Sequence, residues 1–124
     1  MPAHNTEFPW PSYYGNYTFF EERMAFHSRL LCIKPIGSGL YELTRSNGAI
    51  IRVFICECYS FGVAEYHEVV TKIGKIDAII INSNWCGYSN DCKEHCRARK
   101  IGLFNIRDFM AALNIEKFWE YTDQ

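Results

Sequence analysis

The chain has 124 residues and a net charge of −1, and 48% of its residues are hydrophobic and 16% aromatic. This length is typical of one domain and supports a buried core, so an intrinsically disordered chain is excluded. The near-neutral charge excludes nucleic-acid binding by overall attraction, so such binding needs a local basic patch. No apolar run reaches the length of a membrane span, so no membrane partner is expected.

Residues 1–16 hold three of the four prolines and predict an irregular N-terminal arm, followed by a single α/β domain over residues 17–124. Aromatic residues are frequent outside the expected sheet, in the arm and in the C-terminal tail: Phe8, Trp10, Tyr13, Tyr14, Phe118, Trp119 and Tyr121. Large aromatic side chains are common anchors of protein interfaces, so we expect a homodimer. The alternative is that the arm and the tail pack against their own subunit.

The first element after the arm is predicted to be a helix. Thr18 and Glu21 have the spacing of a capping box, so the helix begins at Thr18 and runs to about Leu31. Pro35 prevents its continuation.

A β-hairpin follows. Asn47-Gly48 lies between residues 40–46 and 49–59, which are expected to form the two strands, and predicts a two-residue type I′ turn. Both faces of the second strand are mostly apolar, so this strand is expected to be central in the sheet and covered on both sides.

Helices and strands alternate in the rest of the chain. The expected elements are a helix from Val63 to Ile73 ended by Gly74, a strand over 77–81, a helix from Ser89 or Asn90 to about Lys100, a strand over 101–104 and a helix capped by Asn105. This alternation predicts parallel strands joined by helices. The fold class is therefore α/β, with a mixed sheet, one hairpin and the order α-β-β-α-β-α-β-α.

That order resembles the restriction-endonuclease-like, or PD-(D/E)XK, nuclease fold. The stretch from Asp77 to Cys96 is similar to the late strand, loop and helix of Mrr-type endonucleases, with an apolar strand, small polar residues, an aromatic residue and a Ser cap. The likeness covers roughly residues 40–113. It implies Mg²⁺-dependent DNA cleavage by an acidic residue on one hairpin strand and a Glu-x-Lys or Gln-x-Lys on the next.

The chain departs from this catalytic pattern in the second hairpin strand. If Glu57 takes the place of the family's carboxylate, Tyr59 stands where the lysine belongs; if Glu57 takes the lysine's place, Ile55 replaces the carboxylate. We therefore predict a nuclease-like fold without a complete catalytic set, acting as a binding or assembly domain. The alternative is a divergent endonuclease that holds Mg²⁺ with Glu42 and Glu57.

Glu57 itself allows two interpretations. A buried carboxylate in an apolar strand is costly unless it is paired, and Arg45, Arg52 or a hydroxyl group are candidate partners. The functional interpretation places Glu57 at the C-terminal end of its strand, where open α/β sheets have their sites.

Four Lys and Arg residues lie at positions 93 to 100: Lys93, Arg97, Arg99 and Lys100. Trp85 and Tyr88 come just before them. Aromatic rings stack on bases while cations contact phosphates, so Trp85, Tyr88, Lys93 and Arg97 are the candidate residues for binding nucleic acid or another ligand. The alternatives are a solvated helix face and a small-ligand site in the loop over residues 84–88.

The six cysteines do not have the spacing of a structural zinc site. No pair is Cys-x2-Cys, and Cys92 and Cys96 fall where a helix needs small apolar side chains against a sheet. We expect no metal and no cofactor, apart from Mg²⁺ under the nuclease alternative. Residues 1–10 lack the pattern of a secretory signal, so a cytoplasmic protein with reduced cysteines is expected.

Overall fold

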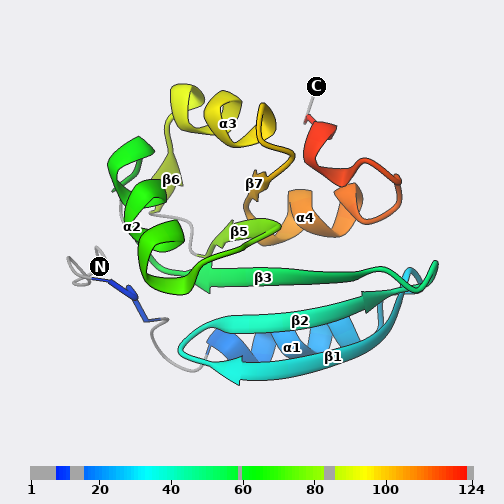
Figure 1. Ribbon diagram of the computed structural model, residues 1–124. Helices are drawn as coiled ribbons and strands as arrows, with labels where there is room; N and C mark the ends of the chain where they lie inside the picture. Colours follow the sequence, from blue (N-terminus) through cyan, green and yellow to red (C-terminus); the bar gives the residue numbers. More distant parts are fainter. Residues whose placement is uncertain (1–7, 12–15, 59, 83–85, 123–124) are drawn as a thin grey trace.

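A mixed sheet separates two layers of helices in the computed structural model, which describes residues 8–11, 16–58, 60–82 and 86–122 (Figure 1). The strands of the main sheet are β1 (Leu30–Gly37), β2 (Leu40–Arg45), β3 (Ile50–Cys56), β5 (Ala78–Ile81) and β7 (Gly102–Phe104). Two short strands, β4 (Ser60–Phe61) and β6 (Gly87–Tyr88), form a separate parallel pair. The helices are α1 (Asn16–Ala25), α2 (Val63–Ile73), α3 (Asn90–Arg97), α4 (Ile106–Ala112) and the short 3₁₀ helix η1 (Phe118–Glu120).

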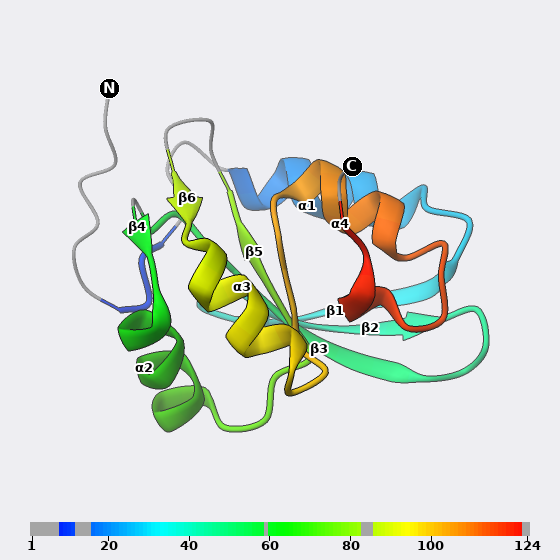
Figure 2. The ribbon, with the colours of Figure 1, turned by 90° about the horizontal axis from the view of Figure 1, so that it is seen from above.

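The strand order in the main sheet is β1-β2-β3-β5-β7, and it confirms the predicted α/β mixed sheet. β1, β2 and β3 are antiparallel, whereas β3, β5 and β7 run parallel to one another. β3 is central, as predicted, because Val53 and Ile55 pack into the core beside α1 and α4, while Phe54 and Cys56 pack into the core beside α2 and α3. Figure 2 shows the two groups of helices from above.

The first helix is shorter than predicted. It begins at Asn16 rather than Thr18 and ends at Ala25, and Leu31, the predicted end of the helix, is 68% exposed and lies in β1. β1 pairs with β2 over most of its length. Pro35 is compatible with β1 because an edge strand does not need every backbone N–H for pairing. This pairing is made with a different segment of the chain, so the spacing of residues within the segment could not indicate it.

The hairpin loop between β2 and β3 is also different from the prediction. Arg45 N donates to Ala49 O at 2.7 Å and Gly48 N donates to Arg45 O at 2.8 Å, so the loop has three residues, 46–48. Only Gly48 has a positive φ, of 90°, whereas a type I′ turn needs positive φ at both Asn47 and Gly48. A turn followed by a glycine bulge therefore connects the strands.

The later elements agree with the prediction in type and order. Gly74 ends α2, where its N donates to Val70 O at 3.0 Å, and Asn105 caps α4. α3 ends at Arg97 rather than near Lys100. The pair β4 and β6 was not predicted, because strands of two residues carry no periodic signal.

The peripheral aromatic residues pack against their own chain where they are described. Trp10 and Phe118 are each 3% exposed, and the Phe8 ring stacks on Phe54 with a centroid distance of 5.7 Å. Tyr13 and Tyr14 lie outside the described residues. The described aromatic residues of the arm and the tail are therefore covered at least in part by their own chain, and the homodimer stays a prediction. Within the described ranges, no helix has the length and apolarity needed to cross a membrane.

Candidate functional site

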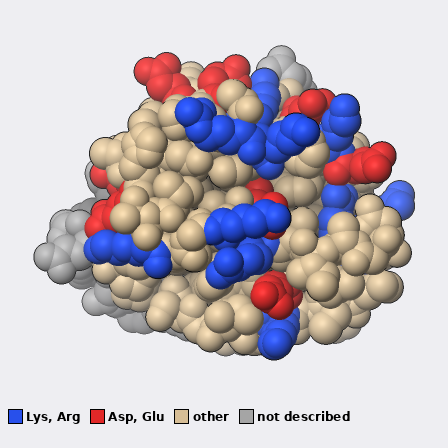
Figure 3. Space-filling view, in the orientation of Figure 1, with Lys and Arg blue, Asp and Glu red and all other residues tan. Residues whose placement is uncertain are grey.

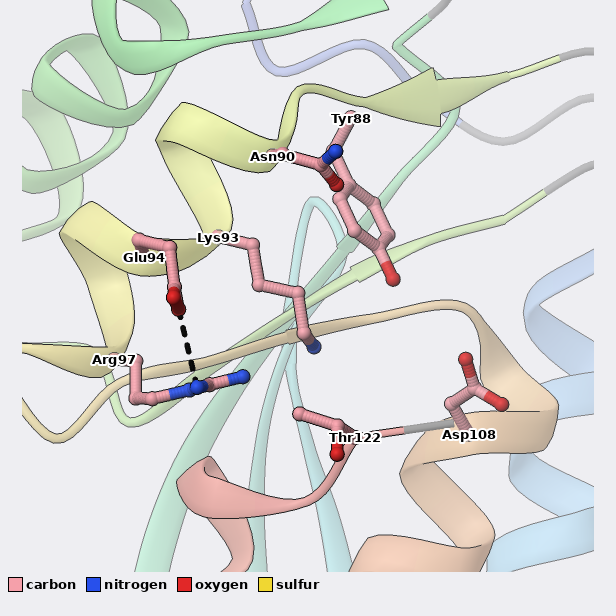
Figure 4. A pocket seen from close by; sticks show the side chains of 7 residues that line it. All are labelled: Tyr88, Asn90, Lys93, Glu94, Arg97, Asp108 and Thr122. Atoms are coloured by element: carbon pink, nitrogen blue, oxygen red, sulfur yellow. Dashed lines mark ion pairs between the residues drawn. The ribbon is translucent and has the colours of Figure 1, made fainter. Parts of the chain in front are cut away.

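An open pocket of about 310 Å³ lies between α3, the start of α4 and the C-terminal segment (Figure 4). Its lining residues come from four parts of the chain: Tyr88, Asn90, Lys93, Glu94, Arg97, Asp108 and Thr122. Three of the four predicted binding residues, Tyr88, Lys93 and Arg97, are thus brought together. The fourth, Trp85, lies outside the described residues.

Helix α3 presents its basic residues to the pocket because its apolar residues face the sheet. Ser89 begins the helix, since its hydroxyl accepts a hydrogen bond from Cys92 N at 3.1 Å. Cys92 and Cys96 are fully buried in the core, as predicted. Lys93 and Arg97 each follow one of these cysteines and are four residues apart, so they share the adjacent helix face.

Lys93 is the most strongly perturbed cation of the pocket. Its Nζ donates to Leu103 O at 2.6 Å and lies 4.1 Å from the centroid of the Phe104 ring and 5.5 Å from that of Tyr88. Desolvation by burial, with a further effect of the nearby Arg97, lowers the pKa of Lys93 to about 8. Asp108 opposes this shift without cancelling it. The amine therefore changes its charge close to physiological pH.

Arg97 contributes the second cation. One of its Nη atoms lies 3.2 Å from Glu94 Oε1, in an ion pair between residues three apart on the helix. Its Nε is buried and has no hydrogen-bond partner among the described residues. An unsatisfied buried donor costs free energy, so an oxygen atom of a ligand that reached it would be favoured.

The opposite wall of the pocket comes from residues that the sequence did not indicate. Asp108, in the first turn of α4, is 8% exposed, and Thr122 belongs to the C-terminal segment (Figure 4). The sequence did place Asp108 in the first turn of the last helix, three residues after the predicted cap Asn105. The structure has this cap, since Asp108 N donates to Asn105 Oδ1 at 2.7 Å. Thr122 had no signal in the sequence. The two carboxylates of the lining balance its two cations, which favours a ligand that carries both anionic and donor groups.

Glu57 lies elsewhere, at the C-terminal ends of the parallel strands. It directly follows β3, is fully buried, and its backbone N donates to Trp10 O at 2.8 Å. Asn82, 6% exposed, is the corresponding residue after β5. Cys56 pairs with Ile81 in the parallel register, so Glu57 and Asn82 each follow the last paired residue of their strand. The predicted partner Arg45 is engaged elsewhere, since its guanidinium donates to the carbonyl oxygens of residues 113, 115 and 116.

The structure does not bring Glu42 and Glu57 together. Glu42 is opposite Arg52 in the register of β2 and β3, five residues from Glu57. At about 3.3 Å per residue this is roughly 16 Å along the strand, too far for two carboxylates to hold one Mg²⁺ ion at about 2 Å. In the part of the chain that is described, no three His, Cys, Asp or Glu side chains form a group that could hold a metal ion.

Among the described residues, the pocket beside α3 combines an accessible volume with converging charged and aromatic groups. Glu57 has a buried carboxylate but lacks a second one from β2. No family model, curated protein or solved structure matches this chain, so its function is argued from the geometry of the pocket.

Proposed function

We propose that this chain is a non-catalytic binding domain with a restriction-endonuclease-like fold, and that the pocket beside α3 binds a nucleotide unit of a single-stranded nucleic acid. The observation that carries the proposal is the convergence of Lys93, Arg97 and the Tyr88 ring on one pocket. Six free cysteines fit a reducing compartment, and we place the protein in the cytoplasm.

Each group of the pocket has a counterpart in a nucleotide. Arg97 and Lys93 suit phosphate oxygens, and the Tyr88 ring suits stacking on a base. Asn90 and the Asp108 carboxylate suit the polar edge of the base, which is exposed only in an unpaired strand. A volume of about 310 Å³ is at the small end of ligand pockets, and it favours one splayed nucleotide over a duplex.

Binding of a single-stranded oligonucleotide is expected to weaken by roughly 10-fold in Tyr88→Ala and in Arg97→Gln, since one stacking contact is worth about 1–3 kcal/mol and one charged hydrogen bond to phosphate about 1.5–3 kcal/mol. Fluorescence anisotropy with labelled ten-residue DNA and RNA strands measures this. The matched controls are Phe26→Ala and Arg29→Gln, whose side chains are exposed and outside the pocket. Equal affinities of the two pocket variants and the wild type, or no binding by the wild type, would refute the proposal.

The affinity for the oligonucleotide is expected to fall as pH rises through about 8. The protonated amine attracts phosphate, and Lys93 loses its proton around that pH. Titrations between pH 7 and 9.5 at constant salt, with a strand of adenine and cytosine only, avoid ionisation of the bases. Lys93→Gln should bind more weakly at pH 7 and show a flat profile. A profile of the wild type that is equally flat contradicts a role for this amine.

No cleavage of plasmid or linear DNA is expected in Mg²⁺ or Mn²⁺. The reason is that Glu57 has no neighbouring carboxylate from β2 and that Glu42 is about five residues away in the register. Agarose gels after prolonged incubation make the measurement. Cleavage that disappears in Glu57→Gln would support the endonuclease alternative instead.

A further inference from the structure

A second hollow, of about 480 Å³, lies just beyond the C-terminal end of α3, between the end of α2, the start of β5 and the turn that leads into β7. Lys75, Arg99 and Lys100 line it together with Asp77, over an apolar floor that includes Ile76 and Ile101. In Figure 3, Lys and Arg side chains gather over α3 and between α3 and β3 on this face of the molecule. We call this hollow the basic basin.

The basic basin has an excess of positive charge, unlike the balanced pocket. Its one carboxylate, Asp77, is already engaged in the fold, because Oδ2 accepts a hydrogen bond from Arg52 N at 2.9 Å. Arg99 is held at the end of the helix by a bond from its Nη1 to His95 O at 2.9 Å. Three cations around one engaged carboxylate suit an anion such as phosphate.

The backbone that presents these cations is strained at Lys100. Ile101 N donates to Cys96 O and Lys100 N donates to Arg97 O, both at 2.9 Å, which is the hydrogen-bond pattern of a Schellman C-cap. Lys100 occupies its left-handed position with φ of 62°, where glycine is the usual residue. A lysine at this position costs stability and places a positive charge at the rim of the basin. Residues held in a strained backbone conformation are frequent at functional sites.

We propose that the basic basin binds a backbone phosphate of the same strand whose nucleotide unit occupies the pocket beside α3. This inference rests on the proposed function and extends it. Arg97 lines the pocket, and Arg99 and Lys100 line the basin, so the two hollows flank the turn that ends α3. The strand then crosses this turn, with a base held on one side and a phosphate a few nucleotides away on the other.

The test is the salt dependence of binding to a labelled ten-residue single strand. Lys75→Gln, Arg99→Gln and Lys100→Gly are each expected to lower the affinity several-fold and to reduce the slope of log K against log salt by about 0.7. Binding of a labelled dinucleotide, which fills the pocket alone, should stay unchanged. Arg29→Gln and Lys34→Gln, with exposed side chains in and just before β1 at the opposite edge of the sheet, are the matched controls.

Lys100→Gly separates binding from folding. Glycine relieves the strained position, so Tm is expected to rise by about 3 °C while affinity for the ten-residue strand falls. A loss of affinity that accompanied a lower Tm would contradict this account of Lys100.

The outcomes distinguish the two proposals. If Arg97→Gln weakens binding while the three basin variants keep the affinity and salt slope of the wild type, the basin inference is overturned and the proposed function stands. If neither Arg97→Gln nor Tyr88→Ala has an effect, the proposed function itself fails. If inorganic pyrophosphate binds and is lost in the basin variants while strand binding is not, the basin takes a free anion and the strand path is wrong.

Discussion

Replacement of Arg45 by methionine is expected to lower the free energy of unfolding by about 3 kcal/mol, because it leaves the buried Leu113 carbonyl and two partly buried carbonyls without their donor. Arg45 is 7% exposed, and its guanidinium donates to Leu113 O at 3.1 Å, Ile115 O at 2.7 Å and Glu116 O at 2.9 Å. It also lies 5.3 Å above the centroid of the Phe118 ring. These bonds hold the chain that leaves α4, so the loss also affects the segment that carries Thr122 to the pocket.

Urea denaturation followed by circular dichroism measures this loss. Arg45→Lys is expected to be intermediate, since an ammonium group keeps the charge but cannot match the fork of the guanidinium. The exposed Arg29→Gln should remain within about 0.5 kcal/mol of the wild type. A loss below about 1 kcal/mol in Arg45→Met would show that water or neighbouring groups satisfy these carbonyls.

Gly39→Ala is expected to destabilise the protein by about 3 kcal/mol or more, because the new methyl group meets backbone rather than space. Gly39 precedes β2 with φ of 90°, and its O accepts a hydrogen bond from Ile55 N at 2.8 Å. A Cβ at this position would collide with Ile55 O, and the Tyr17 hydroxyl and the Phe54 ring stand at 3.4 and 3.5 Å. The collision falls on β3, at the centre of the sheet, so the strand cannot move aside.

Gly48→Ala is the matched control for this substitution. Gly48 has the same φ of 90°, but a Cβ there would meet nothing within 4 Å. It carries only the backbone strain, about 1 kcal/mol. If the two variants unfold in urea with equal m-values, the difference between their unfolding midpoints therefore measures the cost of the collision with Ile55 O. If both variants lost the same free energy of unfolding, the backbone of β2 and β3 would accommodate the new methyl group and the predicted collision would be wrong.

Much of the fold was predictable because its signals are local. Gly74 ends α2 because glycine readily adopts a positive φ, and Asn105 begins α4 because its side chain caps the helix. Both positions were predicted correctly. The apolar run of β3 was long enough to indicate a strand covered on both faces. β1 was missed because a strand at the edge is defined by its pairing with β2 rather than by its own sequence.

The candidate site was predictable on one wall only. Tyr88, Lys93 and Arg97 are close in sequence, and helical spacing alone places the two cations on one face. Asp108 comes from the next helix and Thr122 from the C-terminal segment, and each reaches the pocket only through the packing of α4 and η1 beside β7. No spacing within a single segment carries that information.

The α/β class, the central strand and the basic face of α3 follow from the amino-acid sequence, because each depends on the periodicity of neighbouring residues. The separation of Glu42 from Glu57 follows instead from the strand register, which is visible only in the folded chain. The predicted two-residue loop would have placed Glu42 opposite Val53, whereas the three-residue loop places it opposite Arg52. A shift of one residue in register moves a side chain from one face of a sheet to the other. Glu42 therefore shares its face with Arg52 and Phe54, away from Val53 and Ile55, because hydrogen bonds between strands set the register.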